Sequence, residues 1–428
     1  MKKAVSFVFL LLCGAMVFAQ EADSLKSFTI NANLWSRGEF RDGALPAENG
    51  VDHAAFLMSN NVIRMNYSGK SLEARISPKF FGVWGAKGSG SMAIEEAWFG
   101  LKSGGWFLRL GRQKLSYDDE RIIGSNDWAM ATSTHDILKT GFELGKHKLH
   151  LLAAFNQNNE NTNGGFYYVN GGQAYKTMQT VWYHFDPFPQ LGASLIFMNT
   201  GMQNAMETEE NITEFQQLFG AYASWKPKYF GLQASYYRQT GHDENALPIH
   251  AWMTSLEADG RISDWLSLNT GFFFMSGDEN FFIPAQGALG MTRKTEVRGF
   301  NPIFGSHHEF YGAMDFFYVS TYYGGNTPGL QDYHFGAQLR LFKKLNLGAS
   351  YHLLATAVPI DNATTQILGH EVELEASWQI ARDITLMAGY SFMNGTETME
   401  LLKRSDNDRL RWAWLMLMVT PEFLNHKW

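Results

Sequence analysis

The sequence predicts an all-β protein, a transmembrane antiparallel β-barrel of about 18 strands with short periplasmic turns and long extracellular loops. Alternating apolar and polar runs of roughly ten residues, the length of a tilted membrane strand, recur along the whole chain. Aromatic residues make up 15% of the 428 residues, and polar turns separate the alternating runs. Beyond the N-terminal segment, no apolar run reaches the roughly 18 residues that a helical membrane span needs.

The N-terminal segment has the pattern of a secretory signal peptide. Two lysines precede an apolar run, Ala4–Ala19, that is too short to span a membrane comfortably and ends in small residues. We therefore expect residues 1–20 to be a signal peptide and residues 21–428 to form a single barrel in the outer membrane of a Gram-negative cell. The one cysteine, Cys13, lies in the signal segment, which excludes disulfides and thiolate metal sites from the barrel.

The charge balance excludes a general nucleic-acid-binding protein, because such proteins carry an excess of basic residues. Here 35 Lys and Arg stand against 42 Asp and Glu, a formal net charge of −7 at pH 7. No Pro-rich or Ser-rich linker divides the chain, which favours one domain. We expect neither a nucleic-acid partner nor a cofactor.

Each predicted strand is a run whose alternate side chains face lipid and the barrel interior. In the run 72–84, for example, Ala74 and Ile76 lie on one face, while Arg75 and Lys79 lie on the other. The predicted strands, in chain order, are 28–40, 56–67, 72–84, 94–102, 106–111, 137–144, 149–156, 175–185, 191–199, 214–225, 230–239, 249–262, 266–276, 330–342, 345–356, 368–380, 384–393 and 410–420.

The connections alternate in length. After every even-numbered strand the link is short, as at 68–71, 103–105 and 343–344, whereas links after odd-numbered strands, such as 157–173 and 277–329, are long and polar. Short turns at one rim and long loops at the other are typical of bacterial outer-membrane barrels. An even number of strands then brings both ends of the barrel to the short-turn, periplasmic rim.

The last predicted strand, 410–420, is the most apolar, and we expect it to close the barrel against the first strand. Closure is required because an unpaired sheet edge in lipid costs several kcal/mol for each backbone group. The aromatic residues Phe423 and Trp428 follow it. They resemble the C-terminal signal that the barrel-assembly machinery reads, so that machinery and outer-membrane lipid are the expected partners.

A polar, glycine-punctuated stretch, 111–128, separates two of these strands and is long enough to be functional. This stretch and several later segments resemble the alginate-export family of outer-membrane porins. The similar segments are Gly111–Gln113, Ser116–Asp119, Arg121, Gly124-Ser125, Asp127-Trp128, Asp136, Phe300–Pro302, His308, Tyr311-Gly312, Met314-Asp315, Gly329–Asp332 and Gly369–Glu371. The resemblance implies a monomeric barrel of 18 strands with a basic, arginine-rich lumen that passes an anionic polysaccharide.

Basic side chains fall on the predicted inner face of several strands. A guanidinium group suits a carboxylated sugar because its planar fork can bind a carboxylate through two hydrogen bonds. The predicted lumen residues are Arg37, Arg64, Arg75, Lys79, Arg109, Lys139 and Arg340, with Arg112 and Arg121 at the mouth of the 111–128 loop. Alternatively, these cations simply pair with Glu39, Glu73, Glu96 and residues 118–120 to fill a wide, wet interior.

Three glutamates oppose a purely basic lumen. Glu371, Glu373 and Glu375 are spaced two residues apart, so they share one face of a strand, which we expect to be the inner face. Either they neutralise arginines across the barrel or the pore is not strongly anion-selective.

The acidic residues of the 111–128 loop are interpreted as structural. Three consecutive acids do not converge on a metal ion or form a catalytic pair without a specific turn. The residues expected to hold this loop are Tyr117, Asp118, Asp119, Asp127 and Trp128, with Arg112 or Arg121 as the ion-pair partner. Because His307 and His308 are adjacent, they lack the spacing of a metal site, and we predict no metal.

Two further features have simple interpretations. Aromatic residues near the strand ends, namely Trp84, Trp106, Tyr183, Trp225, Trp265 and Trp378, are expected to anchor the barrel at the membrane interfaces. The longest connection, 277–329, carries Phe281–Pro284 with Arg293, Lys294 and Arg298, and is either a constriction or lid of the pore or a mobile extracellular loop.

We therefore expect a passive outer-membrane channel for anionic oligosaccharides or polysaccharides such as alginate, or for small anions, and not an enzyme. The alternatives are a weakly selective diffusion porin and a plugged structural barrel. A barrel hydrolase is disfavoured because no Ser/His/acid or paired-acid set stands at interpretable positions.

Overall fold

A computed structural model describes residues 26–43, 53–87, 90–130, 132–157, 160, 162, 175–206, 211–279, 294–317, 326–403 and 409–428. The predicted signal peptide, residues 1–20, lies outside these ranges, as do Phe281–Pro284 and Arg293 of the longest connection.

The described strands form a single antiparallel sheet in which neighbours in sequence are neighbours in space. Each predicted strand is present, with ends that differ by a few residues. The strands are β1 (Ser27–Asp42), β2 (His53–Ser68), β3 (Leu72–Val83), β4 (Ser91–Ser103), β5 (Trp106–Gln113), β6 (His135–Leu144), β7 (His147–Phe155), β8 (Thr177–Phe188), β9 (Leu191–Gln203), β10 (Thr213–Trp225), β11 (Phe230–Gly241), β12 (Ala251–Arg261), β13 (Leu266–Met275), β14 (Leu330–Leu341), β15 (Leu345–Ala355), β16 (Ile367–Ala381), β17 (Ile384–Gly395), β18 (Arg409–Val419) and β19 (Glu422–Lys427).

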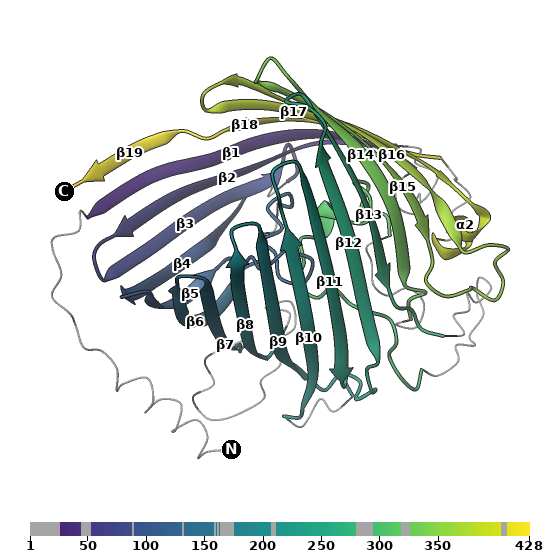
Figure 1. Cartoon of the computed structure of the whole chain (residues 1–428), viewed down its shortest axis with the longest axis horizontal. Helices are drawn as coiled ribbons and strands as arrows, with labels where there is room; N and C mark the ends of the chain where they lie inside the picture. Colours follow the sequence, from purple (N-terminus) through teal and green to yellow (C-terminus); the bar gives the residue numbers. More distant parts are fainter. Residues whose placement is uncertain are drawn as a thin grey trace.

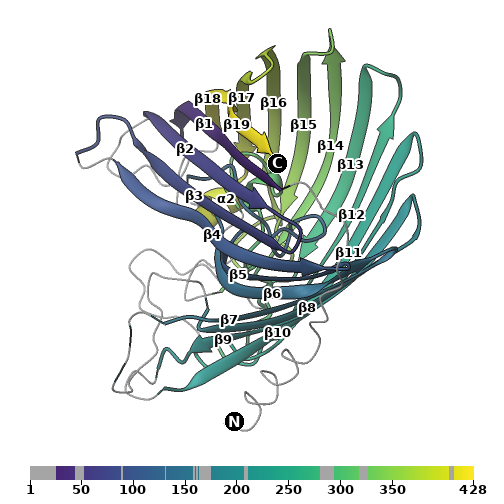
Figure 2. The ribbon, with the colours of Figure 1, turned by 90° about the vertical axis from the view of Figure 1, so that its left-hand side faces the viewer.

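The sheet closes through β1, which pairs with β2 along one edge and with β18 and β19 along the other. Figures 1 and 2 show β1 beside β2 and beside the C-terminal strands. β19 continues the line of β18, so the barrel has 18 strands around its circumference. Closure removes the exposed edge that lipid would not tolerate.

β19 is not among the predicted strands, because Pro421 ends an apolar run and cannot donate a ladder hydrogen bond. The strand nevertheless resumes, since the Pro421 carbonyl accepts a hydrogen bond from Ala32 N at 3.0 Å. The register with β1 shifts between Ile30 and Asn31. Lys26 and Trp428 then exchange two backbone hydrogen bonds at the short-turn rim, where both ends were expected. Recognition of this segment by the assembly machinery stays a prediction.

Alternation sorts side chains between the outer and inner faces of the barrel. In β3, Ile76 is 51% exposed on the outer face, whereas Ser77 and Lys79 are buried inside. The predicted interface anchors Trp84, Trp106, Trp225, Trp265 and Trp378 are all exposed.

Helix is sparse in the described residues, which contain one α-helix, α2 (Glu397–Lys403), and a 3₁₀ turn, η2 (His307–Glu309). Neither these helices nor any other helix in the described ranges is long and apolar enough to cross a membrane.

The barrel interior contains a packed apolar core contributed largely by connections between strands. Leu115, Ile122 and Ile123 come from the β5–β6 connection, and Phe300 and Phe304 come from the β13–β14 connection; all five are buried. A wide barrel would otherwise hold an open aqueous lumen. The two connections therefore decide how much of the lumen stays open.

Candidate functional site

The β5–β6 connection folds into the barrel and packs against the wall formed by β6–β8. The Tyr117 hydroxyl lies 3.1 Å from Nδ1 of His150, and the Tyr117 ring packs against Trp182 at 5.0 Å between centroids. Trp182 Nε1 donates a hydrogen bond to Asp118 at 3.1 Å. Burial raises the pKa of the Asp118 carboxyl, although hydrogen bonds from Ser194 and Trp182 oppose the shift.

The β13–β14 connection folds inward as well and joins the first one. Gly124 N donates to Phe304 O at 2.8 Å, and Phe304 N donates to Ile122 O at 3.1 Å. The Ser306 hydroxyl donates to Glu120 at 2.7 Å. We call the joined segments, residues 114–130 and 300–317, the constriction. Residues 300–317 of the longest connection therefore fold inward, as the interpretation as a constriction expects.

Arg121 fixes the constriction to β12. Its side chain is 3% exposed and pairs with Asp119 at 3.0 Å and with Glu257 on β12. Its guanidinium carbon also lies 4.1 Å from the centroid of the Phe310 ring. Asp119 was expected to pair with Arg112 or Arg121, and the partner is Arg121.

Trp128 links the constriction to the seam where the barrel closes. Its ring stacks on His308 at 4.3 Å and meets Trp414 of β18 edge-on at 4.8 Å. The guanidinium carbon of Arg37 on β1 lies 3.9 Å from the Trp128 ring centroid. Asp127, on the same loop, pairs with Lys114.

Two of the three glutamates on β16 hold the constriction from a third side. Glu371 accepts a hydrogen bond from Met314 N at 2.9 Å, and Glu373 accepts one from Ala313 N at 2.5 Å. Glu373 also lies 3.4 Å from Nε2 of His352. The glutamates face inward as predicted, but neither Glu371 nor Glu373 pairs with an arginine among the described residues. Their partners are backbone amides and a histidine on the neighbouring strand.

The inner faces of β2–β5, which we call the basic wall, carry three arginines at hydrogen-bond distance from glutamates. The pairs are Arg64–Glu95 at 3.4 Å, Arg75–Glu96 at 2.8 Å and Arg109–Glu73 at 2.6 Å. Arg75 and Arg109 remain about one third exposed and flank the Trp98 ring, beside a hollow of about 310 Å³. The alternative that lumen arginines pair with acids is therefore what the geometry shows, although two of them keep exposed area.

The other predicted lumen cations have different surroundings. Arg37 and Lys79 are buried on the inner face, and Lys139 lies inside near the rings of Phe107 and Tyr117. Arg340 is exposed near the short-turn end of β14.

The prediction of Arg112 as a lumen residue is wrong. Strand alternation places it on the face opposite Arg109, beside Ala97 of β4, where it pairs with Asp136 at 2.8 Å. Both side chains are about 40% exposed on the outer surface. The glycine at position 111 has a φ of +126°, but the strand pairing of β5 continues through Gln113, so the face does not change.

The inner faces of β12–β16, which we call the acidic wall, lie opposite the basic wall, since β4 and β13 are half-way round the barrel from each other. Between this wall and the constriction lies a cavity of about 690 Å³. Its charged lining includes Glu257, Asp259, Asp332, Glu373 and Glu375, with His334 and His352.

Sequence reasoning missed Asp332, His334 and His352. The signal was present in part, because Asp332 and His334 are two residues apart on one strand and therefore share a face. Their proximity to His352 depends on the register of β14 and β15, in which His334 lies opposite His352.

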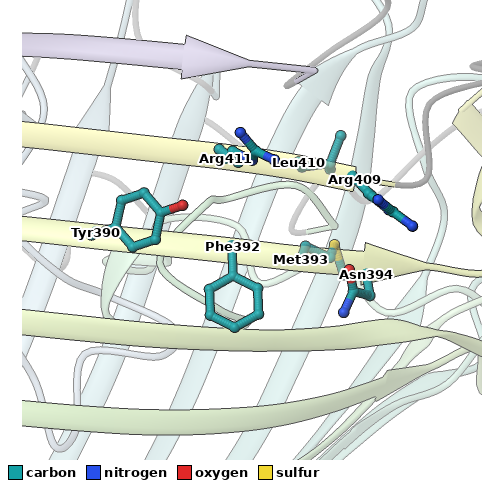
Figure 3. A pocket seen from close by; sticks show the side chains of 7 residues that line it. All are labelled: Tyr390, Phe392, Met393, Asn394, Arg409, Leu410 and Arg411. Atoms are coloured by element: carbon teal, nitrogen blue, oxygen red, sulfur yellow. The ribbon is translucent and has the colours of Figure 1, made fainter.

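A further hollow, of about 520 Å³, lies on the outer surface between β17 and β18. Figure 3 shows Arg409 and Arg411 of β18 with Tyr390 and Phe392 of β17 around it. Arg411 is exposed, while the intervening Leu410 is fully buried on the inner face. The hollow faces away from the lumen, so it does not belong to the conduit. Long cations beside aromatic rings at a strand end suit the membrane interface.

The comparisons with known proteins agree with this architecture. The model of the family described as Alginate export matches residues 85–399. This chain belongs to the alginate-export family. No curated protein sequence matches the chain.

Solved structures give the same fold at low sequence identity. OpdL of Pseudomonas aeruginosa matches with a TM-score of 0.62 and 10% identity, covering 93% of this chain and 99% of OpdL. OccAB4 of Acinetobacter baumannii matches with a TM-score of 0.59 and 11% identity, covering 94% and 99%. The outer membrane protein OprD of Pseudomonas aeruginosa matches with a TM-score of 0.60 and 13% identity, covering 92% and 94%.

The family and the barrel fold together identify this alginate-export family member as an outer-membrane transport channel. The rim of short turns, where Lys26 and Trp428 meet, is then the periplasmic rim. The constriction consists of connections that enter from the opposite, extracellular rim.

Proposed function

We propose that this protein is a passive diffusion channel for carboxylated saccharides, such as oligomers of alginate, or for small organic anions. The observation that carries the proposal is the transverse arrangement of charge. The basic wall presents Arg75 and Arg109 with exposed area, and the acidic wall presents Glu257, Glu373 and Glu375 to the cavity across the barrel.

A uronate suits such a lumen because its carboxylate accepts hydrogen bonds, whereas its hydroxyls can donate them. Its carboxylate accepts hydrogen bonds and is attracted to guanidinium groups, which Arg75 and Arg109 supply. Its hydroxyls donate hydrogen bonds, and the carboxylates of the acidic wall accept them. The acidic wall therefore binds the uncharged hydroxyl groups of the sugar, while the basic wall binds its carboxylate.

Aromatic rings support a saccharide further. Trp98 lies between the guanidinium groups of Arg75 and Arg109, and Trp128 and Trp414 line the cavity on the other side. The flat face of an aromatic ring packs against the apolar face of a sugar ring, because this contact removes apolar surface of both rings from water. A small inorganic anion gains nothing from these rings.

The constriction supports selection by size. It is fixed on three sides by Arg121, Trp128 and the β16 glutamates, so it forms a packed barrier rather than a loose loop. A solute that passes must fit between the constriction and the basic wall or between the constriction and the acidic wall.

The test uses tag-free protein in planar bilayers and in liposomes. We expect the reversal potential in a salt gradient to show anion preference, and short uronate oligomers to enter liposomes faster than neutral oligosaccharides of equal length. The double variant R75Q/R109Q should lower both preferences, by about twofold for each charge, because a unit charge about 8 Å away in water contributes roughly 0.5 kcal/mol.

Arg112→Gln is the matched control, since it removes an arginine of the same strand from the outer surface. Equal permeability to both ions, unchanged in R75Q/R109Q, would contradict the proposal and favour the weakly selective porin. Absence of conductance steps from correctly folded protein would favour the plugged barrel.

A further inference from the structure

We infer that Asp332, His334 and His352 form a binding site for a divalent transition-metal ion of the zinc type in the lumen. One ligand atom of each side chain lies within 4.8 Å of the other two. The three residues come from the inner faces of β14 and β15, and they line the cavity of about 690 Å³ beside the constriction. Imidazole nitrogen and carboxylate oxygen are the ligands that zinc takes in proteins besides thiolate.

The orientation of the two imidazole rings is the strongest argument. Nδ1 of His334 lies 3.1 Å from Asp332, and Nδ1 of His352 lies 3.0 Å from the same carboxylate. The ring centroids are 5.2 Å apart and the planes are nearly parallel, at 28°. Both nitrogens therefore converge on one carboxylate from neighbouring strands.

The opposite nitrogens have the partners that metal-bound histidines need. Nε2 of His334 lies 2.8 Å from Glu257, and Nε2 of His352 lies 3.4 Å from Glu373. A histidine that ligates a metal through one nitrogen almost always donates its other N–H to a carboxylate or carbonyl, which fixes the ring and makes the ligand more basic. Here both outer partners are in place, on β12 and β16.

The charge of the cluster also suits a cation. Three carboxylates, from Asp332, Glu257 and Glu373, surround the two imidazole rings. A divalent ion held by the two Nδ1 atoms and Asp332 offsets negative charge there, while the Nε2 side of each ring keeps its carboxylate partner.

The required movement is small. Adjacent ligand atoms of a tetrahedral zinc site with bonds of about 2.0–2.1 Å are about 3.3 Å apart. The two histidine-to-aspartate distances of 3.0–3.1 Å need to change by a few tenths of an ångström. The widest separation among the three ligand atoms, at most 4.8 Å, has to shorten by about 1.5 Å, which side-chain rotation on adjacent strands supplies.

Three protein ligands leave a fourth position for water or solute, and that position faces the cavity. If the proposed function holds, a bound ion also changes the acidic wall from a surface that repels carboxylates into one that can ligate them. Metal binding itself depends on no assumption about the solute, so the two proposals can fail separately.

The test is calorimetric titration of Zn²⁺ into tag-free, detergent-solubilised barrel, with Co²⁺ absorption as a second measurement, because four-coordinate and six-coordinate Co²⁺ differ strongly in intensity. We expect one saturable site per chain, proton release on binding, and the strong visible bands of four-coordinate Co²⁺. His334→Gln and His352→Gln should each weaken binding at least tenfold, and Glu257→Gln should weaken it by about 10-fold to 100-fold.

His150→Gln is the matched control, because His150 also faces the interior and pairs with a single carboxylate, Glu143, at 3.1 Å. Its affinity should equal that of the wild type. Lack of saturable binding in the wild type, or equal affinity in all variants, would overturn the inference. If the histidine variants do not fold, Glu257→Gln and the Co²⁺ bands of the wild type still decide the matter.

Discussion

The basic wall and the acidic wall balance their charges in different ways. On the basic wall, each arginine meets a glutamate from the same group of strands, as in Arg75–Glu96 and Arg109–Glu73. On the acidic wall, carboxylates are satisfied by the histidine pair and by backbone amides of the constriction. The basic wall therefore pairs its arginines within itself, although Glu95 also meets Lys114 of the constriction at 3.2 Å. The acidic wall relies on histidines and on the constriction.

Both walls contact the constriction. Lys114, directly after β5, pairs with Glu95 of the basic wall at 3.2 Å. Arg121 is a basic residue of the constriction, and it pairs with Glu257 of the acidic wall. The Met314 and Ala313 amides meet glutamates of the same wall. The hollow beside Arg75 and Arg109 lies on the other side. We therefore expect the acidic wall to hold the constriction, while Arg75 and Arg109 of the basic wall stay open to solute.

The largest effect is expected from breaking the contact between the constriction and the acidic wall. Arg121→Ala removes the partner of Asp119 and leaves Glu257 with His334 alone. Breaking a buried ion pair costs about 3–5 kcal/mol. The constriction should loosen and single-channel conductance should rise about twofold or more. Arg112→Ala removes an exposed pair worth about 0–1 kcal/mol, so its conductance should match that of the wild type. Equal conductance in both variants would show that Arg121 does not fix the constriction.

The next effect concerns the sign of selectivity. Glu375→Gln removes a carboxylate of the acidic wall that lines the cavity and is exposed to it. We expect the ratio of anion to cation permeability to rise about twofold, by the same Coulomb estimate of roughly 0.5 kcal/mol. R75Q/R109Q should change the ratio in the opposite direction. Reversal potentials measure both, and a shift of the same sign in the two variants would contradict the two-wall arrangement.

A higher salt concentration should weaken the anion preference that the charges of the two walls produce. The Debye length falls from about 10 Å at 0.1 M to about 3 Å at 1 M, so charges across an aqueous lumen are screened at high salt. We expect the anion-to-cation permeability ratio of the wild type to approach that of R75Q/R109Q as salt rises over this range. A ratio independent of salt would indicate selection by size alone.

The smallest effect is expected from a change of pH, which alters how firmly the β5–β6 connection is held inside the barrel. The pKa of Asp118 is raised in the folded loop by burial, so the inward arrangement binds a proton more readily than a released loop does. The inward arrangement is therefore stabilised as the pH falls through the raised pKa and loses that stabilisation as the pH rises. Open-channel current noise should decrease from pH 7 to pH 4.

Asp118→Asn should make the noise less dependent on pH, because its side chain keeps a hydrogen-bond acceptor for Trp182 and does not titrate. Asp127→Asn, at an exposed carboxylate of the same loop, is the control and should retain the dependence. Identical pH profiles for Asp118→Asn and the wild type would assign the effect to other groups.

The predictability of the strands has a local cause. Successive side chains of a strand point alternately to the lipid and to the barrel interior. The positions of Ile76 and Lys79 in the sequence therefore show which face of β3 meets lipid. The same rule predicted the inward position of Glu371 and Arg75. It failed at β19, where Pro421 interrupts the run, and at Arg112, which was grouped with the loop although β5 still determines its face.

The sequence by itself determined the barrel, its closure and the inner faces, because each of these follows from a repeat that is visible within about ten residues. Only the tertiary structure decided the constriction and the partners of the charges. Glu120 and Ser306 are 186 residues apart, and His334 meets Glu257 across 77 residues. Irregular connections have no period, and the register between strands brings their residues together, so no local pattern in the chain reports these contacts.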